Sequence, residues 1–239
     1  MKKITSFLLA ATVALSFGSC KKSSDDTPYT CATCTSSPEA LVAYDASSKG
    51  IYKGVVIGSS GTIKFSVLND GTTIAAVMVI DGTTVNLTSS ITWVSGVPYV
   101  AAFTGTLNGS PVSITFSVDA NGGSPTVTTS SIPGHPTAEF DIVKETSAAL
   151  IEAFEGTYHT TLPEDGTFNI LLSRPLAKWG GVARENGETT NDHIDGTINA
   201  SGGLVQDGIT VATLSGDNLS GSFVDGNNKT VTVTGKRTL

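Results

Sequence analysis

Short apolar segments separated by turn residues fill the chain from residue 51 onward. In one such segment Ile63, Phe65 and Val67 alternate with polar side chains, and this period of two predicts a strand with one buried and one solvent-facing side. The dipeptide Asn108-Gly109 between two later segments is typical of a two-residue hairpin turn. The pattern therefore predicts an all-β chain of antiparallel meanders.

Seven or eight strands are expected between residues 51 and 130, and further strands follow in the second half of the chain. The run 74–80 is apolar on both faces, so it should be covered on both sides. The expected strands are 51–57, 62–67, 74–80, 83–87, 91–94, 99–107, 112–118 and 126–130, followed by 179–184, 194–198, 209–214, 219–224 and 230–234.

A short helix is predicted before each group of strands. Ser37 can accept an N-cap hydrogen bond, Pro38 suits the first helical position, and Glu39 favours the positive end of a helix. The second helix is expected within 139–154, most clearly over 148–154.

Three blocks of sequence recur in the same order, which indicates an internal repeat. Blocks 40–44, 50–52 and 61–65 are echoed by 149–154, 156–158 and 166–170. We therefore expect two tandem antiparallel β-meander domains, each a small barrel or sandwich with its own core. The expected organisation is a signal peptide at 1–19, a tether at 20–35, a first domain at 36–134, and a second domain at 135–239 whose linker and short helix occupy 135–155.

The inward positions of both domains are expected to be filled. Small eight-stranded barrels have an interior that side chains alone can occupy, so bulky residues leave little room for a ligand. A cavity of roughly a few hundred cubic ångströms is therefore not expected, and finding one would favour a carrier function. The residues expected to point inward are Phe65, Val67, Ile114, Phe116, Phe168, Ile170, Val211 and Phe223.

The first residues of the chain have the pattern of an export signal. Lys2 and Lys3 precede the apolar run 4–17, which is too short to span a bilayer comfortably. Gly18 and Ser19 are small residues of the kind found beside a signal-peptidase cut. The segment Leu15-Ser16-Phe17-Gly18-Ser19-Cys20 resembles a bacterial lipobox, with Phe17 where Leu, Val or Ile is usual.

This resemblance implies cleavage before Cys20 and acylation of Cys20 by chains such as palmitate, which anchor a protein to a membrane. The protein would then be an outer-membrane lipoprotein of a Gram-negative bacterium, facing the periplasm or the cell surface. It resembles envelope lipoproteins of Bacteroidetes type, and the segment 21–26 is similar to acidic tags that export such lipoproteins to the surface. The alternative is an ordinary secretory signal followed by an incidental cysteine.

Cys31 and Cys34 form a C-x-x-C pair in the polar tether. An oxidising compartment favours a local disulfide between them, which would pin the tether onto the first helix. A thioredoxin-like redox site is the alternative, but it would need a helix start within a βαβ pattern. Haem attachment would need His in place of Thr35, and zinc binding would need a second ligand pair. No cofactor is therefore predicted.

The charge of the chain argues against nucleic acid as a partner. The formal net charge is −7, and removal of Lys2 and Lys3 with the signal leaves twelve basic against twenty-one acidic residues, or −9. Nucleic-acid interfaces are positively charged. Charged residues make up only 15% of the chain, which also contains 26 glycines. This composition is typical of a foldable chain with many turns.

Sequence motifs of common enzymes are absent. The chain contains neither a Gly-x-Ser-x-Gly elbow nor a phosphate-binding loop. His135, His159 and His193 lack the partner four residues away that a helical zinc site needs, so no metal site is predicted. We name no catalytic residue, and Trp93 and Trp179 remain as possible ligand contacts, with core packing as the alternative for both.

These observations favour a lipid-anchored, non-enzymatic envelope protein that serves surface structure, adhesion, or binding of a glycan or an envelope protein. A lipocalin-like carrier of a small apolar ligand is the alternative, and an envelope hydrolase is a third hypothesis.

Overall fold

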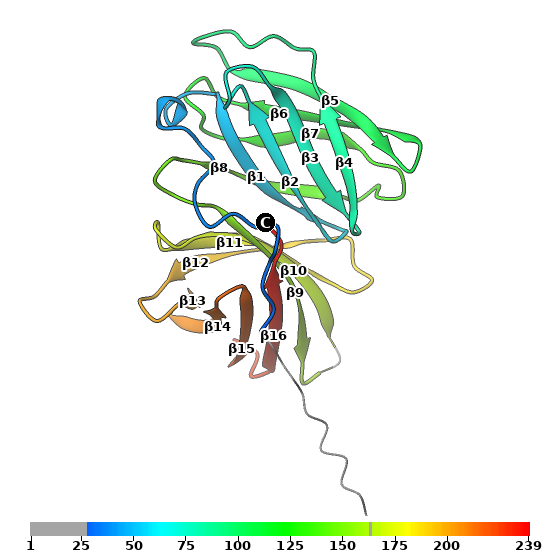
Figure 1. Cartoon of the computed structure of the whole chain (residues 1–239). Helices are drawn as coiled ribbons and strands as arrows, with labels where there is room; N and C mark the ends of the chain where they lie inside the picture. The colour runs from blue at the N-terminus through cyan, green and yellow to red at the C-terminus, as the bar shows by residue number, and fades with distance from the viewer. Residues whose placement is uncertain (1–27, 163) are drawn as a thin grey trace, which may run out of the picture.

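The computed structural model describes residues 28–162 and 164–239, which form two antiparallel β-barrels, one packed against the other (Figure 1). The first barrel has the strand order β7-β6-β5-β4-β3-β2-β1-β8 and is nearly closed, because β7 lies beside β8. The second barrel is closed, with β16 paired to β9. The predicted all-β architecture of two tandem meanders is therefore confirmed.

Consecutive strands are neighbours in both barrels. In the first barrel they are β1 (Gly50–Ile57), β2 (Gly61–Val67), β3 (Ile74–Ile80), β4 (Thr83–Thr88), β5 (Tyr99–Leu107), β6 (Ser110–Val118), β7 (Thr126–Ser131) and β8 (Glu139–Glu145). In the second they are β9 (Glu152–Thr160), β10 (Asp165–Ser173), β11 (Lys178–Glu185), β12 (Asp192–Ile198), β13 (Gly203–Gln206), β14 (Ile209–Ser215), β15 (Asn218–Val224) and β16 (Thr230–Arg237).

Neither predicted helix forms. The segment after Ser37 contributes only a single turn of 3-10 helix, η1 (Val42–Tyr44). The second predicted helix is replaced by β8 and by the start of β9. The edge of β1 pairs with β8 over its whole length, and such tertiary pairing overrides a weak helical preference. Within the described residues, no helical segment has the length and apolar character needed to cross a bilayer.

The boundary between the domains lies later in the chain than expected. It was predicted after residue 134, but β8 belongs to the first barrel, so the boundary lies between β8 and β9. Residues 91–94, predicted as a strand, form a loop, and there the Trp93 indole donates to Ser48 Oγ at 2.8 Å. The short strand β13, which begins at a glycine, was not predicted.

Four aromatic rings fill the centre of the first barrel. Phe65 stacks on Phe116 with ring centroids 4.4 Å apart, and Phe103 meets Phe65 edge-on at 5.0 Å. Tyr52 lies 5.0 Å from Phe116 and donates its hydroxyl hydrogen to the carbonyl oxygen of Ser48 at 2.9 Å. All four rings are fully buried, so the predicted inward positions of this barrel are filled with side chains.

Strand β1 lies between the two barrels, and all of its residues are buried. Val56 faces the core of the first barrel. Val55 points the other way and packs against the second barrel and the connection into it, where it contacts Ile151, Ala153 and Leu171. This strand therefore has two hydrophobic contacts, one on each face.

The face of β1 toward the second barrel also carries Lys53, which is completely buried. Lys53 Nζ lies 2.6 Å from Glu145 Oε2 and 3.5 Å from Glu39 Oε2, and it donates to the carbonyl oxygen of Ile151 at 3.3 Å. Glu145 also accepts the backbone N–H groups of Glu39, Ala40 and Ile151. The Lys53–Glu145 pair therefore joins the N-terminal segment, β1, β8 and the connection into β9.

We expect Lys53→Met to lower the free energy of unfolding by about 3–5 kcal/mol, because it leaves the Glu145 carboxylate buried without its counter-charge. Urea unfolding of the two proteins measures the difference. Lys64→Met is the matched control, since Lys64 binds Glu39 at 2.8 Å near the surface, and an exposed pair contributes at most about 1 kcal/mol. Equal losses in the two variants would contradict the importance of the buried pair.

Candidate functional site

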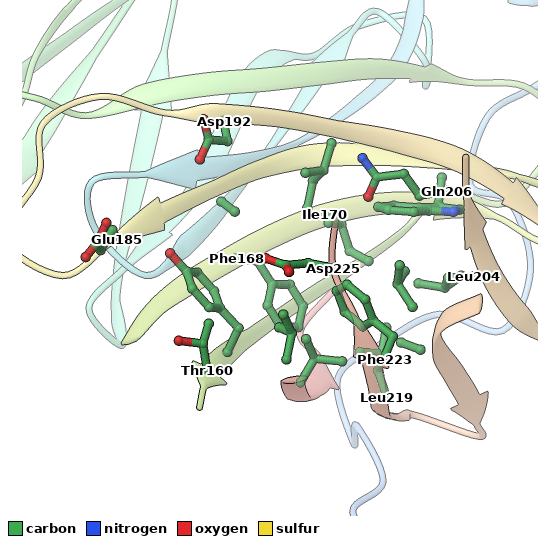
Figure 2. Close-up of a pocket in the computed structure, with 18 of the residues that line it drawn as sticks. Thr160, Phe168, Ile170, Glu185, Asp192, Leu204, Gln206, Leu219, Phe223 and Asp225 are labelled. Carbon is green, nitrogen blue, oxygen red and sulfur yellow. The ribbon is translucent and has the colours of Figure 1, made fainter. Parts of the chain in front are cut away.

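The second barrel encloses a cavity of about 310 Å³, to which all eight of its strands contribute side chains (Figure 2). The wall is mainly apolar. Representative wall residues are Phe168, Ile170, Leu204, Leu219, Val231 and Val233. This volume lies at the lower end of the range for small-molecule sites.

Glycines beside this space allow side chains and neighbouring strands to approach closely. A Cβ atom on Gly156 would collide with the Phe168 ring, and one on Gly196 would collide with the carbonyl oxygen of Val205. These positions require glycine because a ring or a neighbouring strand approaches them closely. Ala183 adds only a methyl group to the same wall.

One end of the cavity is polar and reaches solvent. The exposed side chains of Glu185 and Asp192 line it, together with the partly buried Glu164 and Asp225. Tyr158 lines the same cavity, and the pKa of its phenol is raised, first by burial and then by the negative charges of Glu185 and Asp192. We call these four carboxylates, Glu164, Glu185, Asp192 and Asp225, the acidic rim.

The expectation of two filled interiors is wrong for the second barrel. Phe168, Ile170, Val211 and Phe223 do point inward, but they line a cavity and do not close it. In the first barrel four aromatic rings meet at the centre, whereas here the inward side chains of the eight strands leave a space between them.

The two tryptophans lie in different surroundings, so they do not form a shared site. Trp93 packs against the core of the first barrel, with the Lys49 ammonium 4.3 Å from its ring centroid. Trp179 lines the cavity of the second barrel and is 5% exposed. Among the residues that the structure describes, none accepts a hydrogen bond from Trp179 Nε1.

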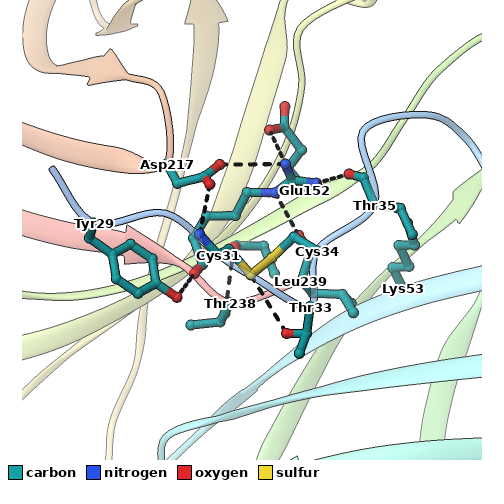
Figure 3. The surroundings of a disulfide bond; sticks show 12 residues. Tyr29, Cys31, Thr33, Cys34, Thr35, Lys53, Glu152, Asp217, Thr238 and Leu239 are labelled. Atoms are coloured by element: carbon teal, nitrogen blue, oxygen red, sulfur yellow. Dashed lines mark hydrogen bonds and ion pairs between the residues drawn. A yellow bond between two sulfur atoms is a disulfide. The ribbon is translucent and has the colours of Figure 1, made fainter.

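The structure pairs Cys31 with Cys34 in a disulfide, and it places them on the second barrel (Figure 3). The Cys31 N–H donates to Asp217 Oδ2 at 2.8 Å, and the Tyr29 hydroxyl donates to the carbonyl oxygen of Arg237 at 2.9 Å. The Arg237 guanidinium in turn donates to the carbonyl oxygen of Thr35 at 2.6 Å. The segment is thus not pinned onto a first helix, as the sequence suggested, but runs along β16. Cys20, the predicted lipidation site, lies outside the described residues.

A polar hollow of about 400 Å³ lies where the two barrels meet. Its lining includes Asn169, which donates to the carbonyl oxygens of Val56 and Ser59, and Arg184, which donates to the carbonyl oxygen of Thr137. These side chains are engaged in holding the barrels together. In the described ranges, no group of three or more His, Cys, Asp or Glu residues is arranged to hold a metal ion.

Comparison of the chain with protein-family models, with curated proteins and with solved structures finds no match.

We expect the double variant Cys31→Ser/Cys34→Ser to lose about 2 kcal/mol or less of unfolding free energy, because the closed loop is very short. Amide hydrogen exchange should quicken in residues 28–36 while β9–β16 keep their protection. Loss of protection throughout the second barrel would show instead that the disulfide stabilises the whole domain.

Proposed function

We propose that the protein is a lipid-anchored envelope protein whose second barrel binds a small, largely apolar molecule. The observation that carries this proposal is the cavity of about 310 Å³, with its apolar wall and one polar end that reaches solvent. Pockets of this kind bury an apolar body and orient it through a few polar groups. The first barrel, with its centre filled by aromatic rings, then serves as a rigid support.

The lipobox resemblance around Cys20 supports the membrane anchor, and residues 21–27 would link the lipid to the folded part. The N-terminal segment runs along β16, so the tether would leave from the ligand-binding barrel (Figure 1). A binding protein of this kind needs no catalytic group, in line with the non-enzymatic hypothesis.

Binding of another envelope protein is a second candidate function. It is favoured by apolar side chains exposed on the connection between β4 and β5 and at the start of β5. These are Ile91, Val94, Val97 and Val100, each between 45% and 57% exposed. Exposed apolar groups that lie near one another are a feature of protein-binding surfaces.

We expect N-phenyl-1-naphthylamine, a neutral apolar probe at pH 8, to bind the purified protein with a rise in its fluorescence. Ala183→Phe should weaken binding at least tenfold, because a phenyl ring at this position would occupy the cavity. Ala183 pairs with Phe168 of the neighbouring strand, and both residues line the cavity. Ala102→Phe is the control, since it adds the same ring to an exposed position of the first barrel. Equal binding by wild type and Ala183→Phe would exclude the cavity as the site.

The anchor is tested separately. Mass spectrometry of the protein from its native membrane should find acyl chains on an N-terminal Cys20, and Cys20→Ala should leave the precursor uncut or the protein unlipidated. A mature N-terminus at another residue, without lipid, would contradict the lipobox interpretation and would leave the cavity unaffected.

A further inference from the structure

The charges around the cavity suggest which apolar ligand it takes, an inference that rests on the proposed ligand-binding function. Every charged side chain that lines the cavity is acidic, and together these residues form the acidic rim. A site for a fatty acid or another anion would place basic or neutral donors at this position.

The acidic rim comes from separate hairpins that end at the same side of the barrel. Glu164 precedes β10, Glu185 and Asp192 flank the β11–β12 turn, and Asp225 follows β15. The pairing of Thr160 with Val231 brings the turns of β9–β10 and β15–β16 together. The closure of the barrel thus gathers carboxylates as far apart in the sequence as Glu164 and Asp225.

Few positive groups offset these carboxylates. Lys229 binds Glu164, and its ammonium group also interacts with the charges of Asp225 and Glu185. Among the described residues, no lysine, arginine or histidine forms an ion pair with Glu185, Asp192 or Asp225. Arg184 is next to Glu185 in the chain, but its guanidinium donates away from the cavity, to Asn191 and Thr137.

The pKa of the phenol that lines the cavity is affected by these negative charges. Tyr158 lines the cavity, and its pKa is raised by burial first and then by the charges of Glu185, Asp192, Glu164 and Asp165. Negative potential at this end of the cavity disfavours a phenolate and would favour a cation in the same place.

Trp179 lines the end of the cavity opposite the acidic rim, because it begins β11 whereas Glu185 ends it. Its Nε1 atom lies against Gly196 of the neighbouring strand, 2.9 Å from where a Cβ would stand, and has essentially no surface open to the cavity. The indole therefore offers a ligand an apolar surface and no hydrogen bond.

We propose that the cavity of the second barrel binds an organic cation, a small molecule with an apolar body and an ammonium group. The apolar body lies among Phe168, Ile170 and Leu219, and the ammonium group lies at the acidic rim beside Glu185 and Asp192. Coulombic attraction to these carboxylates distinguishes this ligand from a neutral or anionic molecule of the same shape.

Three probes that share one apolar body test this inference: 1-naphthylmethylamine, 1-naphthalenemethanol and 1-naphthoate. Calorimetry at pH 7 and low salt should find the amine bound about tenfold more tightly than the alcohol, with the carboxylate weakest. The advantage of the amine should shrink as salt rises from about 0.01 M to 1 M, where the screening length falls to about 3 Å.

Two variants, at the end of β11 and the start of β12, identify the charges responsible. Asp192→Asn should lower the ratio of amine to alcohol affinity by about threefold or more, and Glu185→Gln/Asp192→Asn should bring the ratio close to one. Asp195→Asn is the matched control, because Asp195 is exposed on the same strand but does not line the cavity. It should leave the ratio as in the wild type.

The outcomes separate the two proposals. Binding of all three probes with similar affinity would overturn the cation inference and leave the apolar cavity as a binding site. Failure of all three probes to bind would overturn the proposed function and the cation inference with it. A ratio unchanged in the double variant, or lowered equally by Asp195→Asn, would show that the acidic rim does not select the ligand.

Discussion

A buried ion pair between Lys53 and Glu145 holds the molecule together at the point where its parts meet. Removing two charges from water is costly, and here the cost is offset by close geometry and by three backbone N–H groups that donate to the Glu145 carboxylate. Two of those donors lie in the segment before β1, and the third lies in the connection from β8 to β9. The pair therefore fixes the chain where it enters the first barrel and where it leaves that barrel for the second. Separation of the barrels would expose the pair and the apolar cluster around Val55 together.

The two barrels share a meander topology but differ in how their interiors are occupied. In the first, Tyr52, Phe65, Phe103 and Phe116 meet at the centre. In the second, glycines such as Gly156 and Gly196 let the Phe168 and Trp179 rings lie close to the wall, and the inward side chains leave a space between them. One barrel therefore provides a stable core, and the other keeps a hollow at some cost in packing.

Strand alternation was sufficient to predict most of this fold, because inward and outward residues follow a period of two regardless of tertiary context. The helix predicted over 148–154 was wrong because residues 148–151 form the connection between β8 and β9, and residues 152–154 begin β9, which pairs with β10 and β16. The burial of Lys53 could not be predicted either, since in an alternating strand it reads as a solvent-facing residue until a second barrel covers it. The adjacent apolar residues Val55, Val56 and Ile57 were the available signal that β1 is covered on both faces.

The cavity escaped prediction for a related reason. Bulky inward residues such as Phe168 and Phe223 suggested a filled barrel, but whether opposite walls meet depends on the register with which the barrel closes. The acidic rim is equally hidden in the sequence, where Glu185, Asp192 and Asp225 resemble ordinary solvated turn residues. Only closure brings them around one opening. Like charges gathered in this way repel one another and destabilise the folded state, whereas asparagine or glycine would form the same turns without that repulsion. A cationic ligand at the opening would relieve the repulsion, which makes the placement of these carboxylates understandable as part of a binding site.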